Sequence, residues 1–219
     1  MSSLTPLSAV DPVVLAMLKA PRPGTVKTRL GAEIGFERAT QIYRLLAERQ
    51  MFAVPEGWRR EIHFSPVAAE MEMRAWLGRG HDYFPQCEGD LGRRLGDAVA
   101  GAFGRGATSV VVVGGDCPDL DEGCLREAVA ALRTSDVVLG PALDGGYYLI
   151  GLRRPALRLF SGIPWSTEKV LETTLARITE DHLSYVLLAP KEDIDDLAGL
   201  RRLIGEPDGS DFAKGPLRP

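Results

Sequence analysis

The chain has 219 residues, of which 45% are hydrophobic and 26% are charged, and its formal net charge is -4. This length predicts one compact domain with at most a small appendage, and the composition is too apolar for a disordered chain. The slightly acidic balance argues against a sequence-independent nucleic-acid-binding protein, which needs a basic surface.

The cysteines and the apolar segments indicate the cellular environment. Cys87, Cys117 and Cys124 cannot all pair and form no Cys-x-x-Cys pair, so we expect neither a disulfide framework nor a structural zinc site. Residues 1–11 have no basic residue and no long apolar stretch, and therefore do not resemble a signal peptide. The strongest apolar runs, such as 13–18, are far shorter than the roughly 20 residues that span a bilayer. We expect a cytoplasmic protein without a membrane span.

The hydrophobic pattern predicts strands that alternate with helices. Apolar or alternating runs predict strands at 13–18, 60–65, 83–86, 109–113, 136–140, 147–152 and 185–188. Apolar residues at helical spacing predict helices around 39–47, at 68–77, after the N-cap residues Asp90 and Asp121, at 170–178 and near 196–203. Such alternation predicts an α/β fold with a largely parallel sheet that is covered on both faces.

This pattern also defines the domain and the place of a ligand. We expect a flexible N-terminus at 1–12, a single domain at 13–204 and a loose tail at 205–219. Ligands of such sheets bind beyond the carboxyl ends of the strands, where the winding changes direction. The loops after the strands at 13–18 and 109–113 are therefore the first candidates for a binding site.

The loop expected at 19–30 carries four cations, two of which are Lys27 and Arg29. Gly24 allows backbone amides to turn inward, and Lys27 and Arg29 could both reach one anionic ligand. Arginine binds phosphate through two parallel hydrogen bonds, whereas lysine acts as a point charge. The loop is not a Walker A sequence, because Val26 stands where a glycine is required. We predict a phosphate-binding loop; the alternative is a solvated basic loop.

Acidic residues follow two of the predicted strands. Asp116 comes directly after the strand at 109–113, where Gly114 and Gly115 permit a bend. Magnesium usually takes one or two protein carboxylates and completes its shell with water and phosphate, so Asp116 is a candidate ligand; a turn or N-cap aspartate is the alternative. A second carboxylate could come from 193–196, although acids at a helix N-terminus are also favoured by the helix dipole.

A third candidate is the turn at 140–148, which contains Asp144, Gly145 and Gly146. Successive glycines permit positive φ angles and close approach of the backbone to a ligand, although Asp-Gly is also an ordinary hairpin turn. We interpret Cys117 and Cys124 as packing residues. The three histidines are scattered without the spacing of metal ligands, and we assign them no role.

Taken in order, six segments resemble the bacterial family of nucleotide-diphospho-sugar transferases. This glycosyltransferase-like group is sometimes linked to arsenosugar biosynthesis and is similar to the guanylyltransferase CofC. The six segments are residues 27–30, 86–94, 114–118, 140–141 with 144–151, 165–166 and 193–195. The resemblance implies a glycosyltransferase-A fold, which is a Rossmann-like three-layer sandwich around a mostly parallel, mixed sheet.

The resemblance also implies roles for individual residues. Asp116 would bind a divalent metal, Mg²⁺ or Mn²⁺. The second ligand is either Asp195 or Asp193, because the Asp-Thr-x-x-Asp stretch of related nucleotidyltransferases is altered here. The nucleotide would be bound by the following residues: Gly24, Lys27, Arg29, Gly89, Asp90, Leu91, Gly92 and Gly115. The acceptor would be bound by these: Asp144, Gly145, Gly146, Tyr147, Trp165 and Ser166.

These expectations lead to a metal-dependent transferase. The leading hypothesis is transfer of a sugar from a nucleoside diphosphate sugar to a small-molecule acceptor. The expected catalytic residues are Lys27, Arg29, Asp116 and Asp144. The first alternative is a CofC-like nucleotidyltransferase that releases pyrophosphate from a nucleoside triphosphate. The second is a module that binds nucleotide without turnover.

Overall fold

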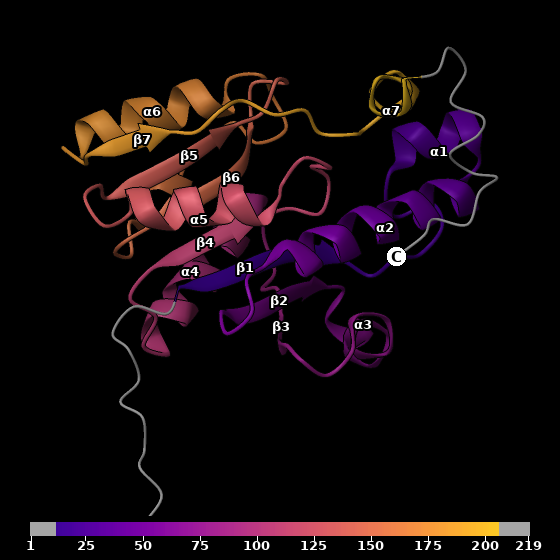
Figure 1. Ribbon diagram of the computed structural model, residues 1–219, viewed down its shortest axis with the longest axis horizontal. Coiled ribbons are helices and arrows are strands. Elements are labelled where there is room, and N and C mark those ends of the chain that lie inside the picture. The colour runs from indigo at the N-terminus through magenta and orange to yellow at the C-terminus, as the bar shows by residue number, and fades with distance from the viewer. Residues whose placement is uncertain (1–11, 206–219) are drawn as a thin grey trace, which may run out of the picture.

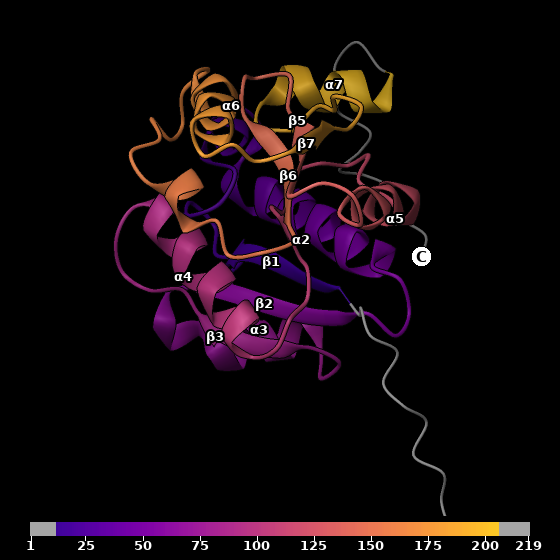
Figure 2. The same ribbon diagram turned by 90° about the vertical axis from the view of Figure 1, so that its left-hand side faces the viewer.

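The computed structural model describes residues 12–205, which form one mixed sheet between two layers of helices (Figures 1 and 2). The strands of the described part are β1 (Val13–Lys19), β2 (Arg59–Ser65), β3 (Asp82–Pro85), β4 (Val110–Val113), β5 (Val137–Pro141), β6 (Tyr147–Leu152) and β7 (Tyr185–Leu187). Their order in the sheet is β3-β2-β1-β4-β6-β5-β7, and β6 runs antiparallel to both of its neighbours. Of the predicted N-terminus only residue 12 is described, and of the predicted tail only Gly205. The other residues of both segments lie outside the described residues.

Helices cover both faces of the sheet. They are α1 (Thr28–Ile34), α2 (Phe36–Ala53), α3 (Glu70–Leu77), α4 (Leu91–Gly104), α5 (Glu122–Ala131), α6 (Val170–Glu180) and α7 (Leu197–Ile204). Helices α2 and α5 lie on one face, and α4 and α6 lie on the other (Figure 2). Each face has its own apolar core, and the valines of β4 contribute alternately to the two cores. The predicted three-layer α/β sandwich is therefore confirmed.

The two predicted N-caps, Asp90 and Asp121, are confirmed. Their carboxylates, and that of Asp196 at the start of α7, each accept a hydrogen bond of 2.8 Å from a backbone amide three residues later. These bonds satisfy amides that have no partner within the helix. Within residues 12–205, none of the helices combines the length and apolar character that a membrane crossing requires.

Helix α1 is the main difference from the sequence prediction. Residues 19–30 were expected to form a loop, but a helix begins at Thr28 and Lys27 is its N-cap with a φ of 47°. The reason is tertiary: Leu30 is completely buried in a small core with residues of α2 and with Ile194 and Leu200. This core also holds α7 against α1, as Figure 1 shows. It therefore joins the segment after β1 to the segment before α7, which are far apart in the sequence.

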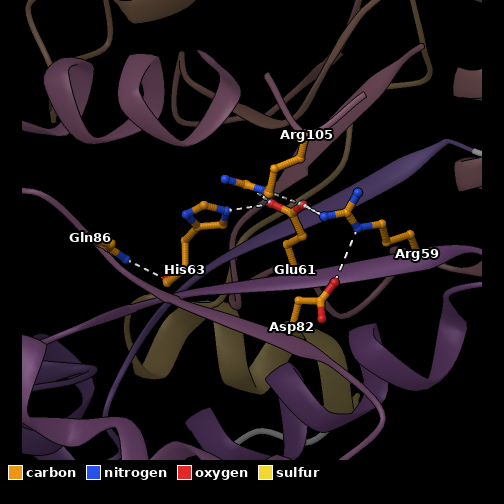
Figure 3. Close-up of polar contacts among 6 residues, drawn as sticks. All are labelled: Arg59, Glu61, His63, Asp82, Gln86 and Arg105. Atoms are coloured by element: carbon orange, nitrogen blue, oxygen red, sulfur yellow. Dashed lines mark hydrogen bonds and ion pairs between the residues drawn. The ribbon is translucent and has the colours of Figure 1, made fainter. Parts of the chain in front are cut away.

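A buried carboxylate on β2 organises a polar cluster near one edge of the sheet (Figure 3). Glu61 is completely buried and pairs with Arg105 at 2.5 Å, with Arg59 at 2.9 Å and with His63 at 3.1 Å. Burial alone would raise the pKa of Glu61, but the hydrogen bonds from His63 and Arg105 and the charge of Arg105 outweigh it and lower the pKa. Glu61 therefore stays ionised, and the stability of the fold around this buried charge depends on the partners of Glu61.

We expect Arg105→Met to lower the free energy of unfolding by about 2 kcal/mol, because a buried charge loses its bidentate partner. The loss should be smaller than for a fully unpaired carboxylate, since Arg59 and His63 remain in contact with Glu61. Urea denaturation followed by circular dichroism at neutral pH measures it.

The matched control is Arg126→Met, because Arg126 also pairs with a glutamate but both side chains are more than half exposed. This variant should change the free energy of unfolding by less than about 0.5 kcal/mol. Equal effects of the two substitutions would contradict the assigned role of Glu61.

Candidate active site

A cavity of about 630 Å³ opens at the carboxyl ends of β1 and β4, where the winding of the sheet changes direction. It is the place that the topology rule predicts for a ligand. Most of the predicted site residues line it: Lys27, Arg29, Leu91, Gly115, Asp116, Asp144, Gly146, Tyr147, Trp165, Ser166 and Asp195. The cationic segment after β1 and the acid after β4 therefore share one cavity.

Lys27 lies at the centre of the charged part of this cavity. Its side chain is only 2% exposed, and its Nζ atom lies 2.6 Å from Asp116 Oδ1 and 3.1 Å from Asp195 Oδ1. Nζ also donates a hydrogen bond to the carbonyl of Ile194. Burial alone would lower the pKa of Lys27, but the charges of Asp116 and Asp195 outweigh it and raise the pKa. Lys27 is therefore a permanent cation at neutral pH.

Two features of the fold bring these residues together. The backbone amide of Ile194 donates a hydrogen bond of 3.1 Å to the carbonyl of Asp116, which ties the segment before α7 to the loop after β4. Ile194 itself is 1% exposed and packs in the small core with Leu30. Because Ile194 is fixed inside this core, the next residue, Asp195, is presented to the cavity.

Asp193 and Asp195 have different environments. Asp195 lines the cavity and its side chain is 52% exposed. Asp193 does not line it, and its Oδ1 atom is buried without a hydrogen-bond partner. Burial, followed by the negative charge of Asp116, raises the pKa of Asp193 to about 7. Of the two residues, only Asp195 therefore shares the cavity with Asp116.

The cluster offers oxygen donors of the kind that small divalent cations prefer. Carboxylate oxygens of Asp116 and Asp195 and the carbonyl of Ile194 all approach one positive charge, the ammonium of Lys27. Within residues 12–205 no group of three or more His, Cys, Asp or Glu side chains is arranged to hold a metal ion. Magnesium does not need one, because one or two carboxylates suffice when phosphates and water supply the other oxygens.

A second wall of the cavity comes from the turn before β6 and the loop before α6. Asp144 Oδ1 accepts a hydrogen bond of 2.9 Å from the amide of Gly146, which holds the turn. Gly145 has a φ of +89°, and a Cβ atom there would lie 2.2 Å from the carbonyl oxygen of Glu168. The close backbone approach expected at Gly145 is therefore to the chain itself, and Gly145 does not line the cavity.

Gly92, which was predicted to bind nucleotide, also has a structural role. A Cβ atom on Gly92 would lie 2.1 Å from the carbonyl oxygen of Phe160, so this glycine permits α4 to pack closely. Asp90 caps α4. Gly24, Gly89, Asp90 and Gly92 do not line the cavity, whereas their neighbour Leu91 does. Their part in nucleotide binding stays a prediction.

Several lining residues were not among the predicted site residues. Tyr43 of α2 reaches the end of β1, where its hydroxyl accepts a hydrogen bond from the amide of Lys19 at 2.9 Å and donates one to its carbonyl at 3.1 Å. Tyr43 was expected only as part of the helix around 39–47. Thr25, Thr28 and Glu168 also line the cavity. Cys117 and Cys124 are buried in the apolar core, as predicted.

Comparison with known proteins identifies relatives of both sequence and structure. The model of a family described as "Uncharacterized protein conserved in bacteria (DUF2064)" matches residues 50–167. A crystal structure from Desulfovibrio desulfuricans G20, described as a "putative nucleotide-diphospho-sugar transferase", shares 33% identity; the match covers 89% of this chain and 86% of that chain, with a TM-score of 0.84. None of the curated proteins matches the sequence.

More distant structures share the fold alone. A cytidylyltransferase from Leptospira borgpetersenii is 15% identical over 94% of this chain and 88% of that chain, with a TM-score of 0.58. The manganese complex of Rv0371c from Mycobacterium tuberculosis H37Rv is 18% identical over 88% of this chain and 98% of that chain, with a TM-score of 0.50. The predicted fold class agrees with all three structures.

Proposed function

Because the chain belongs to the DUF2064 family, we propose that it is a metal-dependent glycosyltransferase that moves a sugar from a nucleoside diphosphate sugar to a small acceptor. Its 33% identity with the Desulfovibrio protein supports a transferase that uses nucleotides. The identity of the donor as a sugar nucleotide and the dependence on a metal are our proposal. One observation carries it: a buried lysine and two carboxylates from distant segments meet in one cavity.

The phosphate groups of the donor are assigned to the cationic end of the cavity. Lys19, Lys27 and Arg29 line this end, and Lys27 is held in place by its two acidic partners. Charges that are fixed before the reaction stabilise a leaving group without reorganisation, which is usually the largest contribution to catalysis. Lys27 and Arg29 would thus stabilise the nucleoside diphosphate as it departs.

Asp116 and Asp195 would hold the divalent cation. When bound there, Mg²⁺ or Mn²⁺ would neutralise charge on the diphosphate. The manganese complex of Rv0371c makes Mn²⁺ a reasonable first ion to test. Asp193 would remain behind Asp195 as a buried group rather than as a ligand.

Asp144 is assigned to the acceptor. It lines the cavity, and the amide of Gly146 donates a hydrogen bond to its carboxylate. In the proposed transfer, the acceptor oxygen bonds to the anomeric carbon and the bond from that carbon to the diphosphate oxygen breaks. The proton of the acceptor hydroxyl passes to Asp144.

Nucleotidyl transfer is the second candidate, because three cations lie at one end of the cavity. A triphosphate carries more negative charge than a diphosphate sugar and would pair with all three of these cations. In this reaction an acceptor attacks the α-phosphate of a nucleoside triphosphate, and pyrophosphate leaves.

The released product separates the two reactions. The protein is incubated with Mg²⁺ or Mn²⁺, a mixture of small acceptors and either UDP-, GDP-, ADP- and dTDP-sugars or the nucleoside triphosphates. We expect acceptor-dependent release of a nucleoside diphosphate. Pyrophosphate instead would establish nucleotidyl transfer, and metal-dependent nucleotide binding without any product would favour the non-catalytic module. The Asp116→Asn variant, purified in parallel, detects contaminating enzymes.

A further inference from the structure

The two ends of the active-site cavity differ in charge. The end formed by β1 and α1 contains Lys19, Lys27 and Arg29, and two acidic residues, Asp116 and Asp195, pair with Lys27 there. The wall formed by the turn before β6 and the loop before α6 contains Asp144 and Glu168. Among the described residues that line the cavity, this wall has no Lys, Arg or His. Among the lining residues described, cations therefore occur only at the first end, and the charged residues of this wall are all acidic.

The anionic wall also has an aromatic and apolar surface. The rings of Tyr147 and Trp165 meet edge to face, with their centroids 6.2 Å apart at an interplanar angle of 79°. Leu91 and Ile150 lie in the same cavity. Aromatic rings offer a flat surface for the apolar face of a ligand, and carboxylates accept hydrogen bonds from hydroxyl groups but donate none when ionised.

This wall is held rigidly by close backbone packing. The carbonyl of Gly145 accepts a hydrogen bond of 2.9 Å from the amide of Leu171, at the start of α6. There is no room for a side chain at Gly145, because a Cβ atom would lie 2.2 Å from the carbonyl oxygen of Glu168. The turn that carries Asp144 and the loop that carries Glu168 are therefore packed directly against each other.

We propose that the acceptor bound at this wall is a hydroxylated compound without negative charge, of the sugar or amino-sugar class. The inference rests on the proposed function and deepens it. A phosphorylated or carboxylated acceptor would face Asp144 and Glu168, with no cation among the described lining residues of this wall to pair with, and juxtaposed like charges oppose binding strongly. The hydroxyl groups of a sugar would instead donate hydrogen bonds to the carboxylates, and its apolar face would pack on Tyr147 and Trp165.

The test is a binding comparison with matched pairs of compounds. The protein is first saturated with Mg²⁺ and with whichever of UDP, GDP, ADP and dTDP gives the largest thermal shift, so that anions cannot bind at the cationic end. Saturation-transfer NMR then measures the affinity of glucose, glucosamine, ribose and glycerol and of their phosphorylated or carboxylated counterparts. We expect at least one of the non-anionic compounds to bind, about 10-fold or more tightly than its anionic counterpart.

A charge reversal at the wall makes the comparison specific. Glu168→Lys should reduce the preference for the non-anionic member of the pair by about 10-fold or more. Glu56→Lys is the matched control, since Glu56 is exposed, lies outside the cavity and changes the net charge equally.

Each result decides the inference. Equal or tighter binding of the anionic members, or no binding of any non-anionic compound, overturns it even though the nucleotide binds and the proposed function stands. If no nucleotide binds with Mg²⁺, the proposed function fails and the inference fails with it.

Discussion

Replacement of Asp116 by asparagine should lower kcat on the order of 10³-fold, because charge stabilisation at a leaving group is the largest catalytic contribution that this site can make. Asparagine has nearly the same shape but no charge, so the variant removes one of the two carboxylates that face Lys27 while keeping the fold. The same variant should lose Mn²⁺ binding to the protein–nucleotide complex. Steady-state kinetics and the electron paramagnetic resonance signal of free Mn²⁺ measure the two effects.

The control for this variant is Asp119→Asn. Asp119 is exposed, lies three residues later in the chain and does not line the active-site cavity. It should retain normal kcat and Mn²⁺ binding. Wild-type turnover and Mn²⁺ affinity in Asp116→Asn would show that the metal part of the mechanism is wrong.

Replacement of Lys27 by methionine should change catalysis and metal binding in opposite directions. Methionine keeps an unbranched side chain of similar length but removes the charge, so the donor phosphates lose a fixed cation and kcat/KM should fall on the order of 10²-fold to 10³-fold. At the same time Asp116 and Asp195 lose the ammonium that lies between them. We therefore expect the nucleotide-free variant to bind Mn²⁺ more tightly than the wild-type protein, measured by isothermal titration calorimetry.

Arg29→Met provides the comparison for Lys27. Arg29 lines the same cavity but is exposed and has no acidic partner among the described residues. It should weaken turnover by about 10-fold, in keeping with a solvent-screened contact, without tightening Mn²⁺ binding. If Lys27→Met left kcat/KM unchanged, or weakened the binding of Mn²⁺ to the nucleotide-free protein, the proposed place of Lys27 between metal ligands and phosphates would be wrong.

The sequence predicted the charged part of the site because strand topology has few solutions. Lys27 follows one buried strand and Asp116 follows another, and the carboxyl ends of parallel neighbours meet at one edge of the sheet. The glycines were harder to interpret. Gly92 and Gly145 are required by contacts with Phe160 and Glu168. A sequence does not distinguish a glycine that is required by packing of the chain from one that is required by close approach of a ligand.

Local sequence patterns could predict neither helix α1 nor the difference between Asp193 and Asp195. Thr28–Ile34 is too short to form a stable helix by its own propensity, and it exists because Leu30 packs against α2 and α7. Asp193 and Asp195 are equivalent in the sequence, and burial separates them: one carboxylate has an unpaired oxygen inside the protein, and the other reaches the cavity.

The sequence by itself determined the layers, the strands and the caps of α4 and α5, because apolar periodicity and capping act between residues that are close in the chain. Only the tertiary structure decided that Lys27 lies between Asp116 and Asp195. That arrangement depends on Leu30 and Ile194, which are far apart in the sequence and share one small core. Contacts of this kind follow from the packing of whole elements, and no local pattern records them.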